Sequence, residues 1–268
     1  MINTETSVAR LVALVPAAGI GVRAAAPGTE PLAKQYRLIA GRPLLWHAVN
    51  ALLRDPRIDE VRVAVVAGDT EAARVLDGLP RTVIRPCGGV TRADTVLQAL
   101  RDAHLEAHDW ALVHDAARPG LPADALARLI DACWNHPVGG LLALPVADTI
   151  KRATVQEADT QKADTQKAGT HAQASAKSPH QTGHGDAQRD CVDSTVSRAG
   201  LWSAQTPQMF RAGALHDALA RALLLGLEIT DESSALEATG VRPLLVRGSS
   251  RNAKVTWPED FDWVGSWL

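Results

Sequence analysis

The residues with the clearest chemical potential lie near the N-terminus, where an apolar run at residues 11–15 meets a glycine-containing loop. Gly19 and Gly21 tolerate positive φ and let the backbone approach a ligand closely. Consecutive N–H groups in such a loop can cradle phosphate oxygens. Arg23 and Lys34 follow and supply the full positive charges that a triphosphate needs. The loop therefore predicts a phosphate site, with a tight strand-to-helix turn and solvated cations as the alternative.

The spacing within this loop argues against a dinucleotide. After Gly19 and Gly21, the position of the third glycine in a dinucleotide-binding fingerprint holds Ala24. No acidic residue stands out about 20 residues further on, where such sites bind the ribose. A mononucleotide triphosphate is therefore the preferred class of ligand.

A second glycine turn and an aspartate are further candidates. Gly88–Gly89 follows an apolar stretch at 81–85, and Asp115 follows another at 110–114. An aspartate at the end of a strand, beside alanines and Arg118, is suited to hold Mg²⁺ near phosphates. Capping of the turn or pairing with Arg118 is the alternative. The magnesium role is favoured because both glycine turns are predicted at the same edge.

These residues need structural elements that bring them to one edge. Apolar stretches predict buried strands, and amphipathic stretches predict helices. Strand and helix alternate, which predicts a mostly parallel sheet covered on both faces, with ligands at the carboxyl ends of its strands. The predicted strands are 11–15, 61–66, 81–85, 110–114, 139–146 and 241–246, and the predicted helices are 43–55, 69–79, 92–103, 122–134, 211–225, 230–239 and 258–267.

The totals of the chain limit its class. At 268 residues it can bury one sizeable core or two small ones. The net charge of −2, with no basic face obvious in the sequence, does not suggest nucleic acid as a partner. There is no signal-peptide core or membrane-length apolar run, and three scattered cysteines fit reduced thiols better than disulfides or a metal site. We therefore expect a cytoplasmic protein with no nucleic-acid or membrane partner.

The composition changes sharply between residues 154 and 190. This stretch contains one large aliphatic residue, Val155, no aromatic residue, and the repeat ADTQK at 158–162 and again at 163–167. It cannot bury enough apolar surface to offset the entropy of ordering, which predicts a disordered insertion at a loop tip. Three histidines suggest a metal tract as the alternative, but their spacing fits no standard site: His171, His180 and His184.

Nine short motifs occur in order along the chain, and together they are far more specific than any one of them. With these motifs the chain resembles the 2-C-methyl-D-erythritol 4-phosphate cytidylyltransferase family, over nearly its whole length from Leu11 except the insertion. The motifs are VPAAGIGVR (15–23), KQY (34–36), GG-x-x-RADTV (88–96), VHDAARP (113–119), DTIK (148–151), R-x-GLW (198–202), TPQ-x-F (206–210), TDESSALE (230–237) and N-x-KVT (252–256).

The resemblance implies an architecture. We expect an α/β Rossmann-like nucleotidyltransferase fold of three layers, with a mostly parallel sheet and a protruding β-arm. Residues 1–268 would form a single cytidylyltransferase domain. The arm, at about 147–198, would cross to the partner subunit of a homodimer and carry the low-complexity insertion 154–190 at its tip.

The resemblance also implies a reaction. A cytidylyl group would move from CTP to 2-C-methyl-D-erythritol 4-phosphate in non-mevalonate isoprenoid biosynthesis, with release of pyrophosphate. A phosphate oxyanion is already nucleophilic at neutral pH, so no general base is required. Catalysis would then consist of alignment and charge neutralisation, with Mg²⁺ or another divalent cation bridging the triphosphate.

Individual residues receive roles from the same resemblance. Arg23 and Lys34 are expected to be catalytic, because they would stabilise the charge that builds on the α-phosphate, and Asp115 is expected to bind the metal. The expected nucleotide-binding residues are Pro16, Ala17, Ala18, Gly19, Gly21, Gly89, Arg92 and Thr95. The expected substrate-binding residues are Lys254, Thr149, Thr206, Arg118 and, from the partner's arm, Arg198.

Four positions depart from the family pattern. Ala33 precedes Lys34 where the family usually has proline, which leaves the placement of Lys34 open. Val90 replaces an acidic residue, so a side-chain contact to cytosine is lost there. Ser197 stands in place of an aspartate and Trp257 in place of an arginine. None of these changes removes a core catalytic group.

Two other functions stay open. A cytidylyltransferase for another polyol phosphate, such as ribitol 5-phosphate, would keep Arg23, Lys34 and Asp115 and differ around the substrate. A nucleotide-binding regulatory protein without activity would be expected to have lost catalytic cations, whereas this chain keeps them. The full set of motifs favours methylerythritol phosphate.

Overall fold

The computed structural model describes residues 8–19, 33–154 and 191–268. The chain divides into two compact units, which are Met1–Pro145 with Trp202–Leu268, and Val146–Leu201. Gly21, Arg23 and nearly all of the predicted insertion lie outside the described residues.

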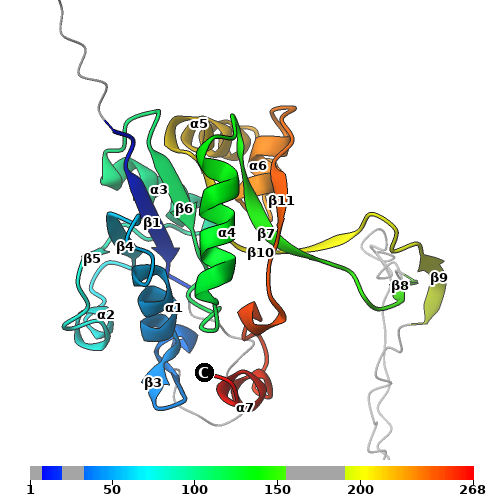
Figure 1. Cartoon of the computed structure of the whole chain (residues 1–268), viewed down its shortest axis with the longest axis horizontal. Helices are drawn as coiled ribbons and strands as arrows, with labels where there is room; N and C mark the ends of the chain where they lie inside the picture. The colour runs from blue at the N-terminus through cyan, green and yellow to red at the C-terminus, as the bar shows by residue number, and fades with distance from the viewer. Residues whose placement is uncertain (1–7, 20–32, 155–190) are drawn as a thin grey trace, which may run out of the picture. The chain divides into compact units, whose positions relative to one another are not determined.

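The larger unit is built on a mostly parallel sheet, whose seven described strands follow the order β11-β7-β10-β6-β1-β4-β5 (Figure 1). Of these strands, β10 runs antiparallel to both of its neighbours, and all other pairings are parallel. The predicted α/β class is therefore confirmed. The strands are β1 (Leu11–Pro16), β4 (Glu60–Ala64), β5 (Thr82–Arg85), β6 (Trp110–Val113), β7 (Gly139–Pro145), β10 (Trp202–Arg211) and β11 (Leu244–Arg247).

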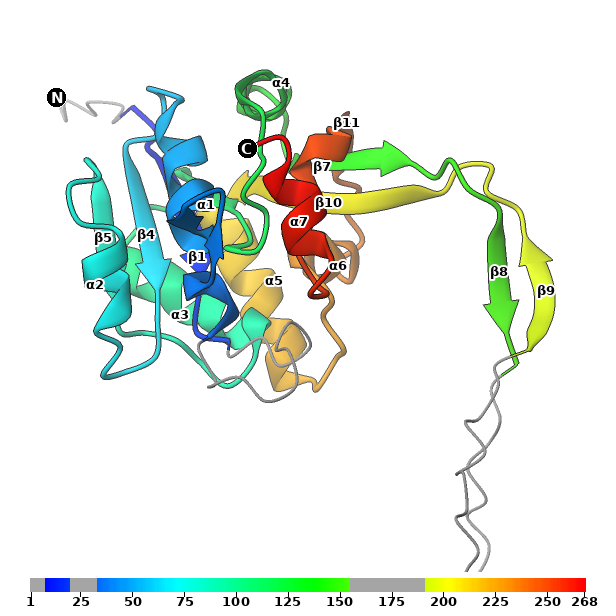
Figure 2. The same ribbon diagram turned by 90° about the horizontal axis from the view of Figure 1, so that it is seen from below.

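Helices cover both faces of this sheet, as Figure 2 shows for α1 and α4 on one side and α3 and α5 on the other. Alternate residues of β1 point to opposite faces, so Ala13 packs in one core and Leu14 in the other. Burial on both faces explains why β1 reads as a continuous apolar run. One core includes α1 (Leu44–Leu53), α2 (Glu71–Val75) and α4 (Ala123–Trp134), and the other includes α3 (Arg92–Ala103), α5 (Ala212–Leu224) and α6 (Glu232–Glu237).

Short elements complete the larger unit. A third, smaller core joins Ile39 and Leu44 to Val255 and Val264, so the last segment of the chain packs beside the start of α1. No described helix is long and apolar enough to cross a membrane. The short elements are η2 (Lys34–Tyr36), β2 (Leu38–Ile39), β3 (Arg42–Pro43), η3 (Ser250–Asn252) and α7 (Asp260–Gly265).

Strand β10 was not among the strands that the sequence predicted. Three polar residues in the middle of this strand, Gln205, Thr206 and Gln208, have side chains that are buried and hydrogen-bonded instead of exposed. Between Ala204 and Gln208 its register with β7 shifts, at the point where Pro207 has no backbone N–H to donate. Such irregularities redirect side chains, and here they bring polar groups behind the cavity described below.

The smaller unit, Val146–Leu201, contains an antiparallel ribbon of two described strands, β8 (Ile150–Ala153) and β9 (Val192–Val196). Both strands are largely exposed. The bounds of this unit are close to those of the predicted arm. That the arm protrudes and crosses to a partner subunit stays a prediction.

Gly139 offers a test of how β7 and β10 pack. Its φ is +105°, and an added Cβ would lie 2.1 Å from the carbonyl oxygen of Met209. We expect Gly139→Ala to lower the free energy of unfolding by about 3 kcal/mol, from overpacking and backbone strain. Gly68 also has positive φ, at +82°, but has open space around it. Gly68→Ala should cost about 1 kcal/mol in urea unfolding, and equal losses at the two sites would contradict the close approach of the two strands.

Candidate active site

A cavity of about 260 Å³ lies at the carboxyl ends of β1 and β6, beside the turn that follows β5. Ligand sites in open parallel sheets are typically found at this edge. The cavity brings together residues from five separate segments that the sequence had singled out. These predicted residues are Pro16, Ala17, Ala18, Gly19, Lys34, Gly89, Arg92, Thr95, Asp115 and Lys254.

The two glycine turns contact each other at the rim of the cavity. An added Cβ at Gly88 would lie 2.4 Å from the Cβ of Ala18 and 2.8 Å from the carbonyl oxygen of Val65. The Gly88 N–H donates to that same carbonyl at 2.8 Å. Ala17 is held in the same way, because its N–H donates to Ala64 at 2.8 Å. A side chain at position 88 would therefore force the two turns apart.

Polar groups fix the second turn from within. The Thr95 hydroxyl accepts from the Gly89 N–H at 3.0 Å and donates to the Thr91 carbonyl at 2.9 Å. The Asp94 carboxylate accepts from the Val90 N–H at 3.0 Å, and Thr91 caps α3 by accepting from the Asp94 N–H. Val90 itself is 99% exposed. Thr95 and Asp94 thus hold the shape of this turn, whose residues 89–92 line the cavity together with Thr95.

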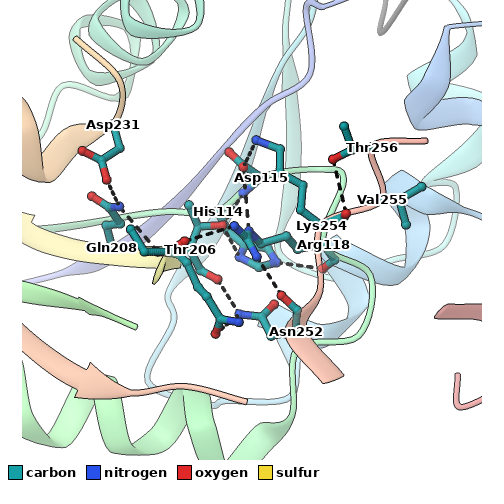
Figure 3. A network of polar contacts seen from close by, with 12 residues as sticks. His114, Asp115, Arg118, Thr206, Gln208, Asp231, Asn252, Lys254, Val255 and Thr256 are labelled. Carbon is teal, nitrogen blue, oxygen red and sulfur yellow. Dashed lines mark hydrogen bonds and ion pairs between the residues drawn. The ribbon is translucent and has the colours of Figure 1, made fainter. Parts of the chain in front are cut away.

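Asp115 lies at the centre of a cluster of charges. Its Oδ1 accepts from the Nε of Arg92 at 2.9 Å, and its Oδ2 lies 2.8 Å from the Nζ of Lys254 (Figure 3). The Nε of Arg118 is 3.9 Å from Oδ2. Arg92 also pairs with the buried Glu232, at 2.6 Å and 3.1 Å. Within the described part of the chain, these three cations meet two carboxylates, which leaves one excess positive charge beside the cavity.

The electrostatics keep Asp115 and Arg92 ionised. Burial works to raise the pKa of Asp115, but the charges of Arg92 and Lys254 outweigh it and hold the pKa well below its usual range. Burial works to lower the pKa of Arg92, but the charges of Glu232 and Asp115 raise it overall. A partly enclosed excess of positive charge is what an incoming polyphosphate requires.

His114 and Thr206 support Asp115 from behind. The Nε2 of the fully buried His114 lies 3.1 Å from the carbonyl oxygen of Arg118, so Nε2 carries the proton. Nδ1 then accepts from the Thr206 hydroxyl at 3.1 Å. That hydroxyl also accepts from the Asp115 N–H at 2.9 Å. The imidazole is neutral, because burial lowers its pKa to about 4.

Asn252 connects the C-terminal segment to this support. Its side-chain Nδ2 donates to the Thr206 carbonyl at 2.7 Å, and its backbone carbonyl accepts from the Arg118 guanidinium at 2.8 Å (Figure 3). The Val255 N–H donates to Ala117 at 2.9 Å. These bonds hold the segment beside the end of β6, and so they bring Lys254 to Asp115.

Lys34 reaches the cavity from η2, a single 3₁₀ turn. Its Nζ donates to the Val255 carbonyl at 2.9 Å, and the neighbouring Gln35 donates to the Ala17 carbonyl at 2.8 Å. The departure at Ala33 therefore does not keep Lys34 away from the first glycine turn.

Other predicted residues do not line the cavity. Thr206 is 4% exposed, and Arg118 packs behind Asp115. Thr149 and Arg198 belong to the smaller unit, where Arg198 donates to the Ala147 carbonyl. Gly21 and Arg23 lie outside the described residues.

Sequence reasoning also missed four polar residues that build the site, although each lies within or beside a motif. Their partners are distant in sequence, so neither spacing nor residue type revealed their roles. These residues are His114, Gln208, Glu232 and Asn252.

The side chains that line the cavity suit a metal ion that binds together with a polyphosphate. Among the described residues, no group of three or more His, Cys, Asp or Glu side chains is placed to hold a metal. Of the described residues that line the cavity, Asp115 alone is acidic. Mg²⁺ is typically held by one or two carboxylates together with substrate phosphates. Asp115 therefore fits an ion shared with a polyphosphate.

The fold and this cavity define a nucleotide-binding α/β protein with a cationic pocket at the carboxyl edge of its sheet. The model of one family, described as 2-C-methyl-D-erythritol 4-phosphate cytidylyltransferase, matches residues 11–174 and 163–266. The chain belongs to that family, and it is therefore an enzyme of the nucleotidyltransferase class. The resemblance inferred from the nine motifs is confirmed.

Relatives and solved structures agree along nearly the whole chain. A Bordetella pertussis protein named 2-C-methyl-D-erythritol 4-phosphate cytidylyltransferase is 57% identical and covers 96% of this chain and 98% of its own length. A Ralstonia nicotianae protein of the same name is 44% identical, with 94% and 89% covered. A crystal structure of 4-diphosphocytidyl-2C-methyl-D-erythritol synthase has a TM-score of 0.72 at 37% identity, with 96% and 98% covered. The Francisella tularensis cytidylyltransferase structure also gives 0.72, at 27% identity, with 97% and 100% covered.

Buried His114 predicts a loss of stability in mild acid. The unfolded chain takes up a proton near the ordinary histidine pKa of about 6.5, whereas folded His114 resists protonation until about pH 4. Protonation therefore favours the unfolded chain as the pH falls. Between pH 7 and 5 this preference lowers the free energy of unfolding by about 2 kcal/mol.

Urea unfolding at both pH values measures this effect. His114→Gln keeps a neutral donor and acceptor and should flatten the dependence on pH. The control His216→Gln changes an exposed histidine and should keep the dependence of the unchanged protein. His47, half-buried with a lowered pKa, adds a smaller loss in the same direction. An unchanged slope in His114→Gln would contradict the role given to this imidazole.

Proposed function

We propose that this chain transfers a cytidylyl group from CTP to 2-C-methyl-D-erythritol 4-phosphate, giving 4-diphosphocytidyl-2-C-methyl-D-erythritol and pyrophosphate. This reaction is part of non-mevalonate isoprenoid precursor biosynthesis. The observation that carries the proposal is the cavity in which Lys34, Lys254 and Arg92 gather beside Asp115 and two glycine turns. The names of the relatives support the choice of substrates.

The reaction requires neutralisation of the phosphate charges and alignment of the two substrates. The substrate phosphate attacks the α-phosphorus of CTP, its oxygen forms the new P–O bond, and pyrophosphate leaves with the bonding electrons. A phosphate oxygen is already anionic at neutral pH, so no proton has to be removed. None of the described residues that line the cavity is a histidine or cysteine. The nearby His114 has both ring nitrogens engaged, which also fits a reaction without a general base.

Two cations are proposed to stabilise the transition state. Lys34 lines the cavity, where its Nζ donates to the Val255 carbonyl, and its position brings a full positive charge to the place proposed for the phosphates. Arg23 is proposed as the second cation from its place in the first glycine loop. Both would act on charge that grows at the α-phosphate as the new bond forms.

Asp115 is proposed to hold Mg²⁺ or another divalent cation. When bound, this ion would neutralise triphosphate charge and help to orient its oxygens. Asp115 fits that role because it is ionised and its N–H is fixed by Thr206. The nucleotide itself would lie against the main chain of the two glycine turns.

The second substrate is proposed to bind on the Lys254 side of the cavity. Lys254 is 41% exposed in its side chain and can turn toward a phosphate. Arg118 would support that phosphate, and Thr206 would need to open one of its two hydroxyl bonds to contact it directly. Thr149 and Arg198 are proposed to complete this site from the arm.

We also propose a homodimer in which the arm at 147–198 of each chain supplies Arg198 to its partner. The exposed β8–β9 ribbon is consistent with such a role, because its strand edges offer unpaired backbone groups. A cytoplasmic location fits the free thiols of Cys87 and Cys133.

The decisive assay is pyrophosphate release from CTP, with and without a polyol phosphate. We expect release with 2-C-methyl-D-erythritol 4-phosphate and Mg²⁺, and little release with CTP alone or with ribitol 5-phosphate. Turnover of the ribitol compound alone would reassign the substrate. CTP binding without any release would indicate a regulatory protein instead of an enzyme.

Lys34→Ala tests the catalytic cation. We expect kcat to fall by about two to three orders of magnitude, comparable to the loss of one electrostatic donor. Arg128→Ala serves as the control, because Arg128 is an exposed cation on α4 paired with Asp124. That control should keep the rate of the unchanged protein. A near-normal rate in Lys34→Ala would mean that this lysine has been misassigned.

A further inference from the structure

Glu232 is a fully buried carboxylate that the proposed reaction does not use. It is the first residue of α6, and it does not line the cavity. Its two oxygens accept from the Nη1 and Nη2 of Arg92 at 2.6 Å and 3.1 Å. The two residues are 140 positions apart, so the pair joins α6 to the start of α3.

A buried ion pair of this kind is weak evidence for stability. Removing two charges from water is costly, and apolar residues of similar volume often replace such pairs without loss. Stability alone therefore does not explain why α3 and α6 are joined by a charged pair. The other contacts of Arg92 suggest an explanation.

Arg92 divides its guanidinium between two carboxylates. Its Nε and Nη2 face the Oδ1 of Asp115, both at 2.9 Å, while Nη1 and Nη2 face Glu232. Asp115 is the residue proposed to take a divalent cation. A cation there competes with the cations that Asp115 already holds. Lys254 can leave for water or for a phosphate because its side chain is 41% exposed.

Glu232 cannot follow Arg92 if Arg92 moves, because the start of α6 is fixed. Asp231 caps this helix by accepting from the Ser234 N–H at 2.9 Å. Gln208 of β10 holds the same turn twice, donating to Asp231 and accepting from the Ser233 N–H, both at 2.8 Å. Glu232 is therefore a fixed counter-charge behind the cavity.

We propose that Glu232 is a positioning residue that keeps Arg92 paired when Asp115 turns to the divalent cation of a metal–CTP complex. This inference rests on the proposed function. With Glu232 in place, Arg92 retains a carboxylate partner after Asp115 is engaged. Without it, Arg92 would be left unpaired beside the bound cation, or would stay on Asp115 and exclude that cation.

The readout is the gain in CTP affinity that Mg²⁺ provides, measured by calorimetry without the second substrate. It is the ratio of the dissociation constant for CTP without Mg²⁺ to that with Mg²⁺. We expect E232Q to reduce this ratio by about tenfold or more, because it removes the second counter-charge of Arg92. Affinity for metal-free CTP should be kept or rise, because one negative charge near the phosphates is lost.

Two further variants complete the test. E237Q removes a carboxylate from the exposed end of α6 and should keep the ratio within about twofold of the unchanged protein. E232D keeps the charge but shortens its reach, and it should give an intermediate ratio. It also serves as the buried-site variant should E232Q fail to fold, as judged by thermal unfolding of each protein.

The outcomes separate this inference from the function on which it rests. A ratio in folded E232Q or E232D equal to that of the unchanged protein would overturn the inference and leave a purely structural ion pair. Equal loss of affinity with and without Mg²⁺ would also overturn it. Failure of the unchanged protein to bind CTP at all would overturn the proposed function, and this inference with it.

Discussion

The ionised carboxylate of Asp115 is the constraint on which the rest of the site depends. It is buried at the end of β6, where an unpaired charge would be very costly, so cations must surround it. Two of those cations come from distant segments, Arg92 at the start of α3 and Lys254 near the C-terminus, and the third, Arg118, lies three residues after Asp115. Because these cations outnumber the carboxylates among the described residues, the arrangement that keeps Asp115 ionised also makes the cavity attractive to phosphates.

The same constraint explains why the support behind Asp115 is uncharged. Thr206 and His114 hold the backbone of Asp115 and Arg118, and the backbone carbonyl of Asn252 accepts from the Arg118 guanidinium. All three supporting residues use neutral donors and acceptors. A charged imidazole there would add a fourth cation to a cluster in which, among the described residues, three cations already share two carboxylates. The buried, neutral His114 fixes the positions of the groups that it bonds, and it does so without changing the charge beside the cavity.

The sequence predicted a feature well when the interacting residues are close in sequence, and poorly when they are far apart in sequence. The helix predicted at 92–103 is α3 to the residue, because Thr91 gives a local capping signal and the apolar spacing is regular. Strand β10 was missed because the buried residues in its middle are polar, and their hydrogen-bond partners are Asp115, Ser249 and Asp231, which are distant in sequence. Most of the predicted cavity residues were found through motifs. Glu232 was placed in a predicted helix and in one of the nine motifs, but its pairing could not be predicted, since its partner Arg92 is 140 residues away.

The cavity has two walls that are built in different ways. The cationic wall is set by long-range pairs, so a change in one partner alters the charge that another residue presents. The other wall, the turn at 89–91, is set by short-range contacts, in which Thr95 and Asp94 accept from the N–H groups of Gly89 and Val90. Both N–H groups are therefore engaged within the turn, whereas the side chain of Val90 is exposed. A side-chain change at position 90 should for this reason disturb the wall less than a change in Thr95 or Asp94, which hold its shape.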